Sequence, residues 1–343
     1  MNADLRGMNL EEIQEKIKSL GFEKYRGEQV FSWVHSKAVR SFDEMTNLPA
    51  ALKEKIAEKN RLTEFNITDI SVSAIDGTKK LLFEFSGGAY SECVLLYSRE
   101  RITLCISSQS GCACNCAFCS TAELGFKRDL TAGEIVTEFM ESEREAGAKI
   151  DNVVFMGMGE PLLNYDNVVK ATEILNMPKG RGLSSSRVTV STVGITDIIR
   201  KTADENRPFN LAISLITANP ELRARLVPVD RKYPLKEIME AARYYNKKTG
   251  REVLFECIVF GGLNDAEDDA YEILRLINRV KCKVNLIPYN PGERKDFKRP
   301  DIDRVNAMHK ILVDAGFMTF VRKEKGADIS AACGQLALKK TVK

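Results

Sequence analysis

Four cysteines stand close together in the stretch GCACNCAFC, residues 111–119. Cysteine thiolates are preferred ligands of iron–sulfur clusters and of zinc. Cys112, Cys116 and Cys119 are spaced C-x-x-x-C-x-x-C. Three thiolates on one short loop could bind three irons of a [4Fe–4S] cluster and leave the fourth iron open. We interpret Cys114, which stands between them, as a bystander.

Zinc is the main alternative for this loop. A structural zinc site usually takes four ligands, from two C-x-x-C pairs or from added histidines. The chain holds only two histidines, His35 and His309, and neither is near the loop in sequence. Cys114 could be a fourth ligand, although thiolates at every second residue suit one tetrahedral ion poorly. The pattern favours the [4Fe–4S] cluster, with zinc and unliganded thiols as alternatives.

The composition indicates an ordinary globular chain of 343 residues, 44% hydrophobic and 29% charged. No apolar run approaches the ~18 residues of a membrane span, and the N-terminus lacks a signal-peptide pattern. We therefore expect a cytoplasmic protein without membrane contact. Nine cysteines are an odd number, which in a reducing compartment favours metal or thiol chemistry over a disulfide framework.

Charge is distributed unevenly along the chain. The formal net charge is only +3, but residues 291–343 carry 12 Lys and Arg against 7 Asp and Glu. Residues 1–98 carry 13 against 15. A basic C-terminal part is compatible with phosphate contacts. A solvated lysine-rich surface would look the same.

The pattern of elements divides the chain into three parts. Residues 1–62 predict a helical accessory domain with the amphipathic stretches NLEEIQEKIKSLG, RGEQVFSWVHSK and LPAALKEKIAEKN. Residues 63–98 alternate between apolar and polar side chains and contain DG and GG turns, which predicts a β-hairpin extension. Residues 99–343 repeat a strand-then-helix pattern.

Six apolar strands are expected in this third part: RITLCISS, DNVVFMG, SRVTVST, FNLAISLI, REVLFECIVF and KVNLIPY. Such strands alternating with helices predict an α/β fold with a parallel sheet, either a partial (β/α)6 barrel or a doubly wound open sheet. Chemistry in both folds sits where the strands end. The unusual segments GCACNCAFC, GMGEP, STVG, SLIT and PYN all stand at such ends.

The cysteine spacing, with Phe118 before the last cysteine, resembles the radical S-adenosylmethionine (SAM) superfamily. The resemblance implies a [4Fe–4S] cluster whose open iron binds the amino and carboxylate groups of SAM, which is then cleaved to a 5′-deoxyadenosyl radical. VVFMGMGEP resembles the stretch that receives the amino end of this cofactor, which implies roles for Gly159 and Glu160. Taken alone, that stretch reads as a strand-to-helix glycine turn.

Further motifs resemble the bacterial methyltransferase family that modifies C2 of adenosine in 23S ribosomal RNA and in certain transfer RNAs. They are LCISSQSGCACNCAFCSTAELGFKRDLT, FMGMGEPLLNYDNV, STVGI, LAISL, LVPVDRKYPL, VNLIPYNP and ADISAACGQLA, in the family's order over nearly all of the chain. YRGEQVFSWVHSKAVRSFDEMTNLP resembles its N-terminal domain. A close relative methylates C8 instead, but CSTAELGF and GEPLLN are more similar to the C2 enzyme.

The resemblance implies a covalent mechanism. Cys333 would take a methyl group from one SAM molecule, and the radical from a second would activate that methyl group for addition to C2. Cys105 would then form a transient disulfide with Cys333 as the methylated base leaves. Glu92 would accept the C2 proton. Buried structural cysteines and a solvated strand carboxylate are the plainer interpretations of these three residues.

The resemblance also implies contacts to SAM from Ser191, Ser214, Leu215, Ile216 and Asn290. The chain departs from the family here, because the family usually reads S-L-H where this sequence reads Ser214-Leu215-Ile216. Isoleucine has no side-chain hydrogen bond to offer. Any cofactor contact at this position must therefore come from the backbone, and a change in cofactor affinity or substrate is the consequence to test.

The implied partners are 23S ribosomal RNA, transfer RNA as a second substrate, and a flavodoxin- or ferredoxin-type electron donor. We expect a monomer. The basic loop NPGERKDFKRPD is a candidate for RNA contact. Two further interpretations stay open: a radical SAM enzyme with a changed substrate, and a metal-stapled RNA-binding protein without catalysis.

Overall fold

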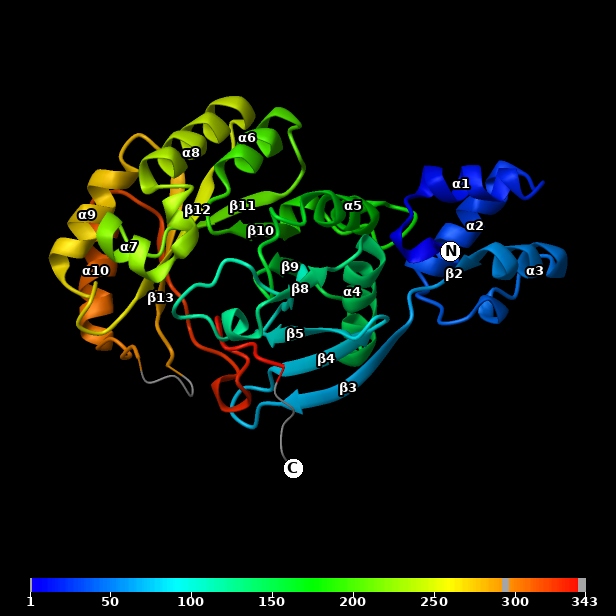
Figure 1. The fold of residues 1–343 in the computed structure, drawn as a ribbon, viewed down its shortest axis with the longest axis horizontal. Helices are drawn as coiled ribbons and strands as arrows, with labels where there is room; N and C mark the ends of the chain where they lie inside the picture. Colours follow the sequence, from blue (N-terminus) through cyan, green and yellow to red (C-terminus); the bar gives the residue numbers. More distant parts are fainter. Residues whose placement is uncertain (1, 292–295, 339–343) are drawn as a thin grey trace.

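A ten-stranded mixed sheet covered by helices forms the main body of the computed structural model, which describes residues 2–291 and 296–338 (Figure 1). The strand order is β14-β13-β12-β11-β10-β9-β6-β5-β4-β3. The parallel strands are β6 (Ile102–Ile106), β9 (Asn152–Phe155), β10 (Val188–Thr192), β11 (Asn210–Ser214), β12 (Val253–Val259), β13 (Cys282–Pro288) and β14 (Thr319–Val321). The first six of these are the six predicted strands.

The sheet does not close, because β14 and β3 stand at opposite ends of its order. The parallel strands follow one another in chain order from β6 to β14, without the reversal that marks a doubly wound sheet, so the α/β fold class and the partial barrel are confirmed. The helices of the barrel are α4 (Ala132–Ala146), α5 (Tyr165–Asn176), α6 (Thr196–Asp204), α7 (Pro220–Leu226), α8 (Leu235–Thr249), α9 (Glu267–Ile277) and α10 (Ile302–Asp314). Within the described ranges, no helix is long and apolar enough to cross a membrane.

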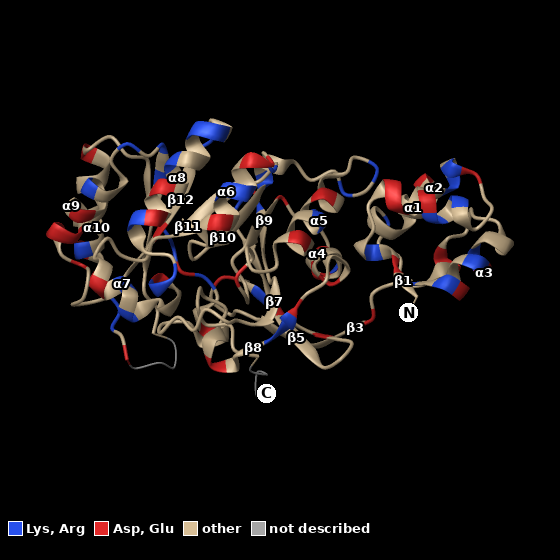
Figure 2. Cartoon of the chain, turned by 45° about the horizontal axis from the view of Figure 1, so that its top comes forward, with Lys and Arg blue, Asp and Glu red and all other residues tan. Residues whose placement is uncertain are grey.

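Helix and strand chemistry explains these layers. The strands are rich in buried Val, Ile, Leu and Phe, whereas the helices turn charged residues outward (Figure 2). The helix α4 begins at the predicted capping box, in which Thr131 and Glu134 satisfy each other's backbone N–H groups. Burying both faces of a parallel sheet leaves its strand ends as the place for a polar site.

Residues 63–98 form three strands where a hairpin of two was predicted. They are β3 (Phe65–Val72), β4 (Lys79–Phe85) and β5 (Ala89–Tyr97), an antiparallel meander that continues the main sheet through β6. The register of β3 shifts between Ile67 and Asp69, and most of its side chains are at least partly exposed. Such an irregular edge strand has a weak alternating pattern, which explains why the sequence did not reveal it.

The N-terminal helices α1 (Leu10–Ser19), α2 (Lys24–His35) and α3 (Ala50–Lys59) lie at one end of the molecule around a core of their own (Figure 1). Short parallel strands β1 (Ala3–Asp4) and β2 (Asn60–Arg61) bring the ends of this unit together. A buried cation connects it to the barrel.

That cation is Arg6, whose side chain is fully buried. It donates to Thr137 Oγ1 on α4 at 3.1 Å and to the Val39 carbonyl at 3.0 Å, and it stands 3.8 Å from the Glu141 carboxylate. A buried guanidinium with partners on both sides fixes the angle of the N-terminal unit against α4.

Candidate active site

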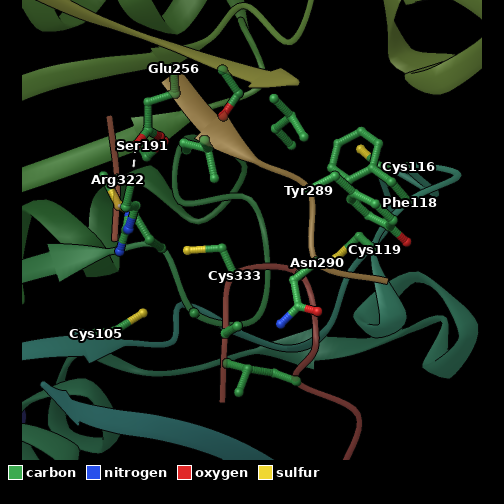
Figure 3. A pocket seen from close by; sticks show the side chains of 18 of the residues that line it. Cys105, Cys116, Phe118, Cys119, Ser191, Glu256, Tyr289, Asn290, Arg322 and Cys333 are labelled. Carbon is green, nitrogen blue, oxygen red and sulfur yellow. Dashed lines mark hydrogen bonds and ion pairs between the residues drawn. The ribbon is translucent and has the colours of Figure 1, made fainter. Parts of the chain in front are cut away.

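A cavity of about 600 Å³ lies where the loops after the parallel strands converge (Figure 3). Most of the predicted site residues meet there. The predicted residues that line it are Cys105, Cys112, Cys116, Phe118, Cys119, Gly159, Glu160, Ser191, Ser214, Ile216, Asn290 and Cys333. Glu92 and Leu215 are fully buried and do not line it.

The cysteine loop is carried by a small antiparallel hairpin of β7 (Gln109–Gly111) and β8 (Phe126–Asp129). The backbone of Gly111 is left-handed, with φ +75°, and a Cβ atom here would stand 1.7 Å from the Gly125 carbonyl oxygen. The N–H of Cys112 donates to the same oxygen at 3.2 Å. Only glycine permits this close approach, which fixes the direction in which the loop leaves the sheet.

Two backbone hydrogen bonds hold the far side of the loop. The Ala117 N–H donates to the Leu226 carbonyl at the end of α7 at 2.9 Å. The Ser120 N–H donates to the Gly334 carbonyl at 2.7 Å, next to Cys333. The loop is therefore tied to the segment that carries the proposed methyl acceptor.

The three predicted cluster ligands, Cys112, Cys116 and Cys119, all line the cavity. Burial raises the pKa of Cys116 and of Cys119, so iron binding must displace their protons. Three thiols on one short loop suit a [4Fe–4S] cluster, in which each thiolate binds a different iron.

Cys114 contacts Cys112 in this loop. Its backbone N–H stands 3.5 Å from Cys112 Sγ. A side-chain hydrogen bond between the two lowers the pKa of Cys112 and raises that of Cys114. Cys114 is thus a donor to a candidate ligand, and its bystander role stays a prediction.

Aromatic rings enclose one side of the loop. The ring centre of Phe118 is 5.8 Å from that of Phe260, which in turn stands 4.8 Å from Tyr289 and 5.1 Å from Phe297. Such an apolar wall restricts the access of water to a cluster and thereby tunes its redox potential. Phe118, the aromatic residue before the last cysteine, is thus part of the apolar wall beside the cysteine loop.

Glu160 is a buried carboxylate at the cavity wall. Its two oxygens accept the N–H groups of Val193 at 2.8 Å and Leu162 at 2.9 Å. Burial raises its pKa to about 7, against these hydrogen bonds. The preceding Gly159 has φ +98°, and a Cβ atom there would come within 2.6 Å of Gln109. A fixed carboxylate of this kind suits an ammonium group as ligand.

Glu256 and Arg322 line the cavity, although the sequence analysis missed both. Glu256 accepts a hydrogen bond from Ser191 Oγ at 2.9 Å, and Arg322 Nη1 stands 3.7 Å from its other oxygen. A carboxylate inside the apolar strand REVLFECIVF was a signal that could have revealed Glu256. Arg322 follows β14, a strand that was not predicted.

Ile216 occupies a strained bend. Its φ is +66°, an outlier for a β-branched residue that costs about 1–3 kcal/mol. Its N–H donates to the Glu256 carbonyl at 3.0 Å, and its side chain belongs to the apolar cluster around Cys116 and Phe260. The side chain that departs from the family thus packs toward the cysteine loop, where the cavity is apolar.

Arg223 on α7 stabilises the bend at Ile216 through hydrogen bonds to neighbouring carbonyl groups. It is fully buried, forms an ion pair with Asp230, and donates to the carbonyls of Leu215 at 3.0 Å and Val193 at 2.7 Å. One guanidinium thereby ties the ends of β10 and β11 together. The motif LVPVDRKYPL contributes Asp230 to this support rather than to the cavity.

The C-terminal segment, residues 326–338, folds back over the cavity. Asp328 accepts a hydrogen bond from Ser73 Oγ at 2.7 Å, and Asp76 accepts one from the Gly326 N–H at 3.0 Å. Both bonds fasten the segment to the turn between β3 and β4. Its fold brings the exposed Cys333 to the cavity.

Cys105 lies across the cavity from Cys333 (Figure 3). It is buried, and burial followed by the charge of Cys333 raises its pKa to about 12, whereas Arg322 acts in the opposite direction. All nine cysteines are free, so the expected disulfide between Cys105 and Cys333 is not formed in this structure. Cys93 and Cys257 are buried in the core, and Cys282 is partly exposed.

Glu92 lies next to the cavity but is covered. It shares one face of β5 with Val94 and Leu96, which do line the cavity. Its Oε1 stands 3.1 Å from Lys80 Nζ, and its Oε2 accepts the N–H of Leu338 at 3.1 Å. The proposed proton acceptor is therefore capped by the C-terminal segment, and its role stays a prediction.

Comparison with family models finds two matches. The radical SAM superfamily matches residues 106–277, and the ribosomal RNA large subunit methyltransferase N-terminal domain matches residues 3–62. The first match contains the cysteine loop and the ends of β6 and β9 to β12. The second contains the helices α1 to α3.

Similar proteins cover almost the whole chain. A probable dual-specificity RNA methyltransferase RlmN of Thermotoga sp. (strain RQ2) is 44% identical over 337 residues, 98% of each chain. The protein of the same name in Alkaliphilus oremlandii (strain OhILAs) is 41% identical over 336 residues, again 98% of each. The crystal structure of a radical SAM methyltransferase from Sphaerobacter thermophilus has a TM-score of 0.91 at 39% identity, covering 97% of this chain and 98% of that one.

Proposed function

The chain belongs to the RlmN family of radical SAM RNA methyltransferases, and we propose that it methylates C2 of an adenosine in 23S ribosomal RNA and in transfer RNA. One observation carries this proposal: Cys105 and Cys333 line the same cavity as the three cysteines of the loop. Radical cleavage of SAM needs only the loop. Two further thiols on opposite walls supply a covalent route for a methyl group.

The residues that line the cavity suggest where the cluster and SAM would bind. The three loop thiolates would hold the [4Fe–4S] cluster, while Glu160, Ser191, Ser214, Asn290 and the backbone of Ile216 would hold SAM beside it. When bound, these groups supply the one-electron chemistry that C2 requires, since this electron-poor carbon has no lone pair to attack a sulfonium methyl group.

The protein side chains perform the remaining steps. The Cys333 thiolate attacks the methyl carbon of SAM, and the electron pair of the broken C–S bond stays on the donor sulfur. After the carbon has joined C2, the adduct would give one electron back to the bound redox group, and Glu92 would accept the C2 proton. The Cys105 thiolate would then attack the Cys333 sulfur to form the S–S bond, while the electron pair of the C–S bond goes to the leaving carbon, which takes up a proton to become the methyl group. The disulfide must be reduced before the next turnover.

Nucleoside mass spectrometry tests the reaction. Anaerobic turnover of the reconstituted enzyme with SAM, a reductant and unmodified large-subunit RNA should yield 2-methyladenosine. A parallel reaction with unmodified transfer RNA tests the second substrate. The product 8-methyladenosine would identify the C8 reaction instead. No methylated adenosine from enzyme with an intact cluster would contradict the proposal and point to a changed substrate.

Two variants test the thiols. C333A should abolish methylation and leave the visible absorbance of the cluster in place, because Cys333 is not a cluster ligand. C105A should accumulate RNA that is covalently attached to Cys333, seen as a shifted band on a denaturing gel. If C105A forms no adduct under turnover conditions, Cys105 is not the resolving thiol.

The electron donor, the oligomeric state and the cellular location are part of the same proposal. A flavodoxin- or ferredoxin-type protein would deliver the electron, and a monomer in the cytoplasm would meet both RNA substrates. Part of the basic loop NPGERKDFKRPD, residues 292–295, lies outside the described residues.

A further inference from the structure

Arg322 lies beside both reactive thiols and has no role in the scheme above. Its backbone N–H donates to the Leu286 carbonyl on β13 at 2.8 Å, which fixes where the side chain starts. The side chain is 24% exposed and lines the cavity together with Cys105 and Cys333. Figure 3 shows the side chain of Cys333 pointing toward the guanidinium.

The other contacts of this guanidinium are weak. Arg322 Nη1 is 3.7 Å from Glu256 Oε1 and 3.6 Å from Met156 Sδ. Charge-assisted hydrogen bonds are about 2.7–2.9 Å long, so this ion pair with Glu256 is loose. Guanidinium has five N–H donors, and these contacts leave donors for an anion in the cavity. Glu256, whose second oxygen is held by Ser191, keeps the cation in place without neutralising it fully.

The charges around the thiols agree with this geometry. The Cys333 thiolate is the largest cause that raises the pKa of Arg322, ahead of opposing burial and of smaller contributions from Glu256 and Cys105. The charge of Cys333 and the direction of its side chain in Figure 3 thus point to the same pair of groups.

Other charged groups at the cavity wall have partners elsewhere or lie in solvent. Arg299 stands 2.7 Å from the Glu324 carboxylate, and Lys325 donates to the Tyr97 carbonyl. Lys323, next to Arg322, is exposed. Arg322 is thus the cation whose position suits the sulfur of Cys333.

We propose that Arg322 is a positioning residue for the methyl-accepting step, in which its guanidinium stabilises the Cys333 thiolate and holds the sulfur toward the cofactor cavity. The inference rests on the proposed function. When the thiolate attacks the methyl carbon of SAM, the new C–S bond consumes the negative charge of the thiolate, and the electron pair of the broken bond neutralises the donor sulfonium. Methylation therefore removes the anion that Arg322 holds. The neutral S-methyl group is then free to move toward the base.

Thiol reactivity tests this role without turnover. The cluster-loaded protein, free of SAM, is treated with iodoacetamide from pH 6 to 9.5, and alkylation of Cys333 is quantified by peptide mass spectrometry. R322M should slow the alkylation at pH 7.5 by about tenfold or more and shift its pH profile upward, because only the thiolate reacts. R322K should restore much of the rate, since it keeps the charge. K323M removes a neighbouring charge as the matched control and should behave like the wild type.

The outcomes separate this inference from the function on which it rests. If R322M alkylates like the wild type, Arg322 does not stabilise the thiolate and the inference fails. R322Q replaces R322M if the latter does not fold or load its cluster. A second measurement follows S-methylcysteine at position 333 after addition of SAM. Its absence from the wild type would contradict the proposed function, whereas equal rates in wild type and R322M would overturn only the role of Arg322.

Discussion

Replacing Gly111 by alanine tests whether the hairpin under the cysteine loop positions the cluster ligands. The new Cβ atom would stand 1.7 Å from the Gly125 carbonyl oxygen, so β7 and β8 must separate. Separation breaks the hydrogen bond from the Cys112 N–H to Gly125 and the neighbouring strand pairing, at about 1 kcal/mol for each bond. The left-handed backbone adds about 1–2 kcal/mol. We expect a local cost of about 3–4 kcal/mol that disorders the loop and spares the barrel.

Gly125 provides the matched control. Its φ is +62°, but a Cβ atom there would meet nothing within 4 Å. G125A should therefore carry only the backbone cost of about 1–2 kcal/mol. After anaerobic reconstitution, iron and sulfide are measured per chain, and circular dichroism checks the fold. We expect G111A to lose most of its cluster and G125A to keep it. A full cluster in folded G111A would refute the reasoning.

Two more predictions concern stability. Burial raises the pKa of Glu138 from 4.5 to about 8, so the folded chain keeps a proton that the unfolded chain releases. This group alone should lower the stability by up to about 4 kcal/mol as the pH rises from 4.5 to 8. In urea unfolding, E138Q should lose that much less than the wild type, while the smaller loss from Glu160 remains in both proteins; equal losses in both proteins would contradict it. R6M removes the buried cation between the N-terminal unit and α4 and should cost about 3 kcal/mol. R40M removes a half-exposed partner of the same Glu141 and should cost less than about 1 kcal/mol. Equal costs would refute the role of Arg6 in holding the N-terminal unit against α4.

The barrel could be predicted because its signal is strong. Six strands are largely apolar runs in a parallel sheet, and each is followed by a helix of ordinary length before the next strand of the sheet begins; after β11, the short α7 comes first. The strands and helices that were missed are short or exposed. The strand β14 has three residues, with Phe320 50% exposed, and α7 has seven residues. Edge elements of this kind bury too little apolar surface to leave a periodic pattern in the sequence.

The site could be predicted only in part, because its other half depends on contacts across the chain. The order of parallel strands places GCACNCAFC, GMGEP and PYN at one edge, which is why their residues meet as expected. No local pattern shows that Asp328 binds Ser73, 255 residues away. Without that contact, neither the cover over Glu92 nor the position of Arg322 beside Cys333 could be inferred.

The C-terminal segment connects three parts of the proposed chemistry. It carries Cys333, donates the Leu338 N–H to Glu92, and receives the Ser120 N–H of the cysteine loop at Gly334. Glu92, the proton acceptor of the proposed scheme, is fully buried with Lys80 as its ion partner. The proposed scheme therefore requires the Leu338 contact to Glu92 to open, while the hydrogen bond at Gly334 can stay in place. Cys333 can keep its position in that case, because it lies between two other contacts of the segment: Asp328 with the turn between β3 and β4, and Gly334 with the cysteine loop. The Leu338 contact to Glu92 lies beyond both of them in sequence.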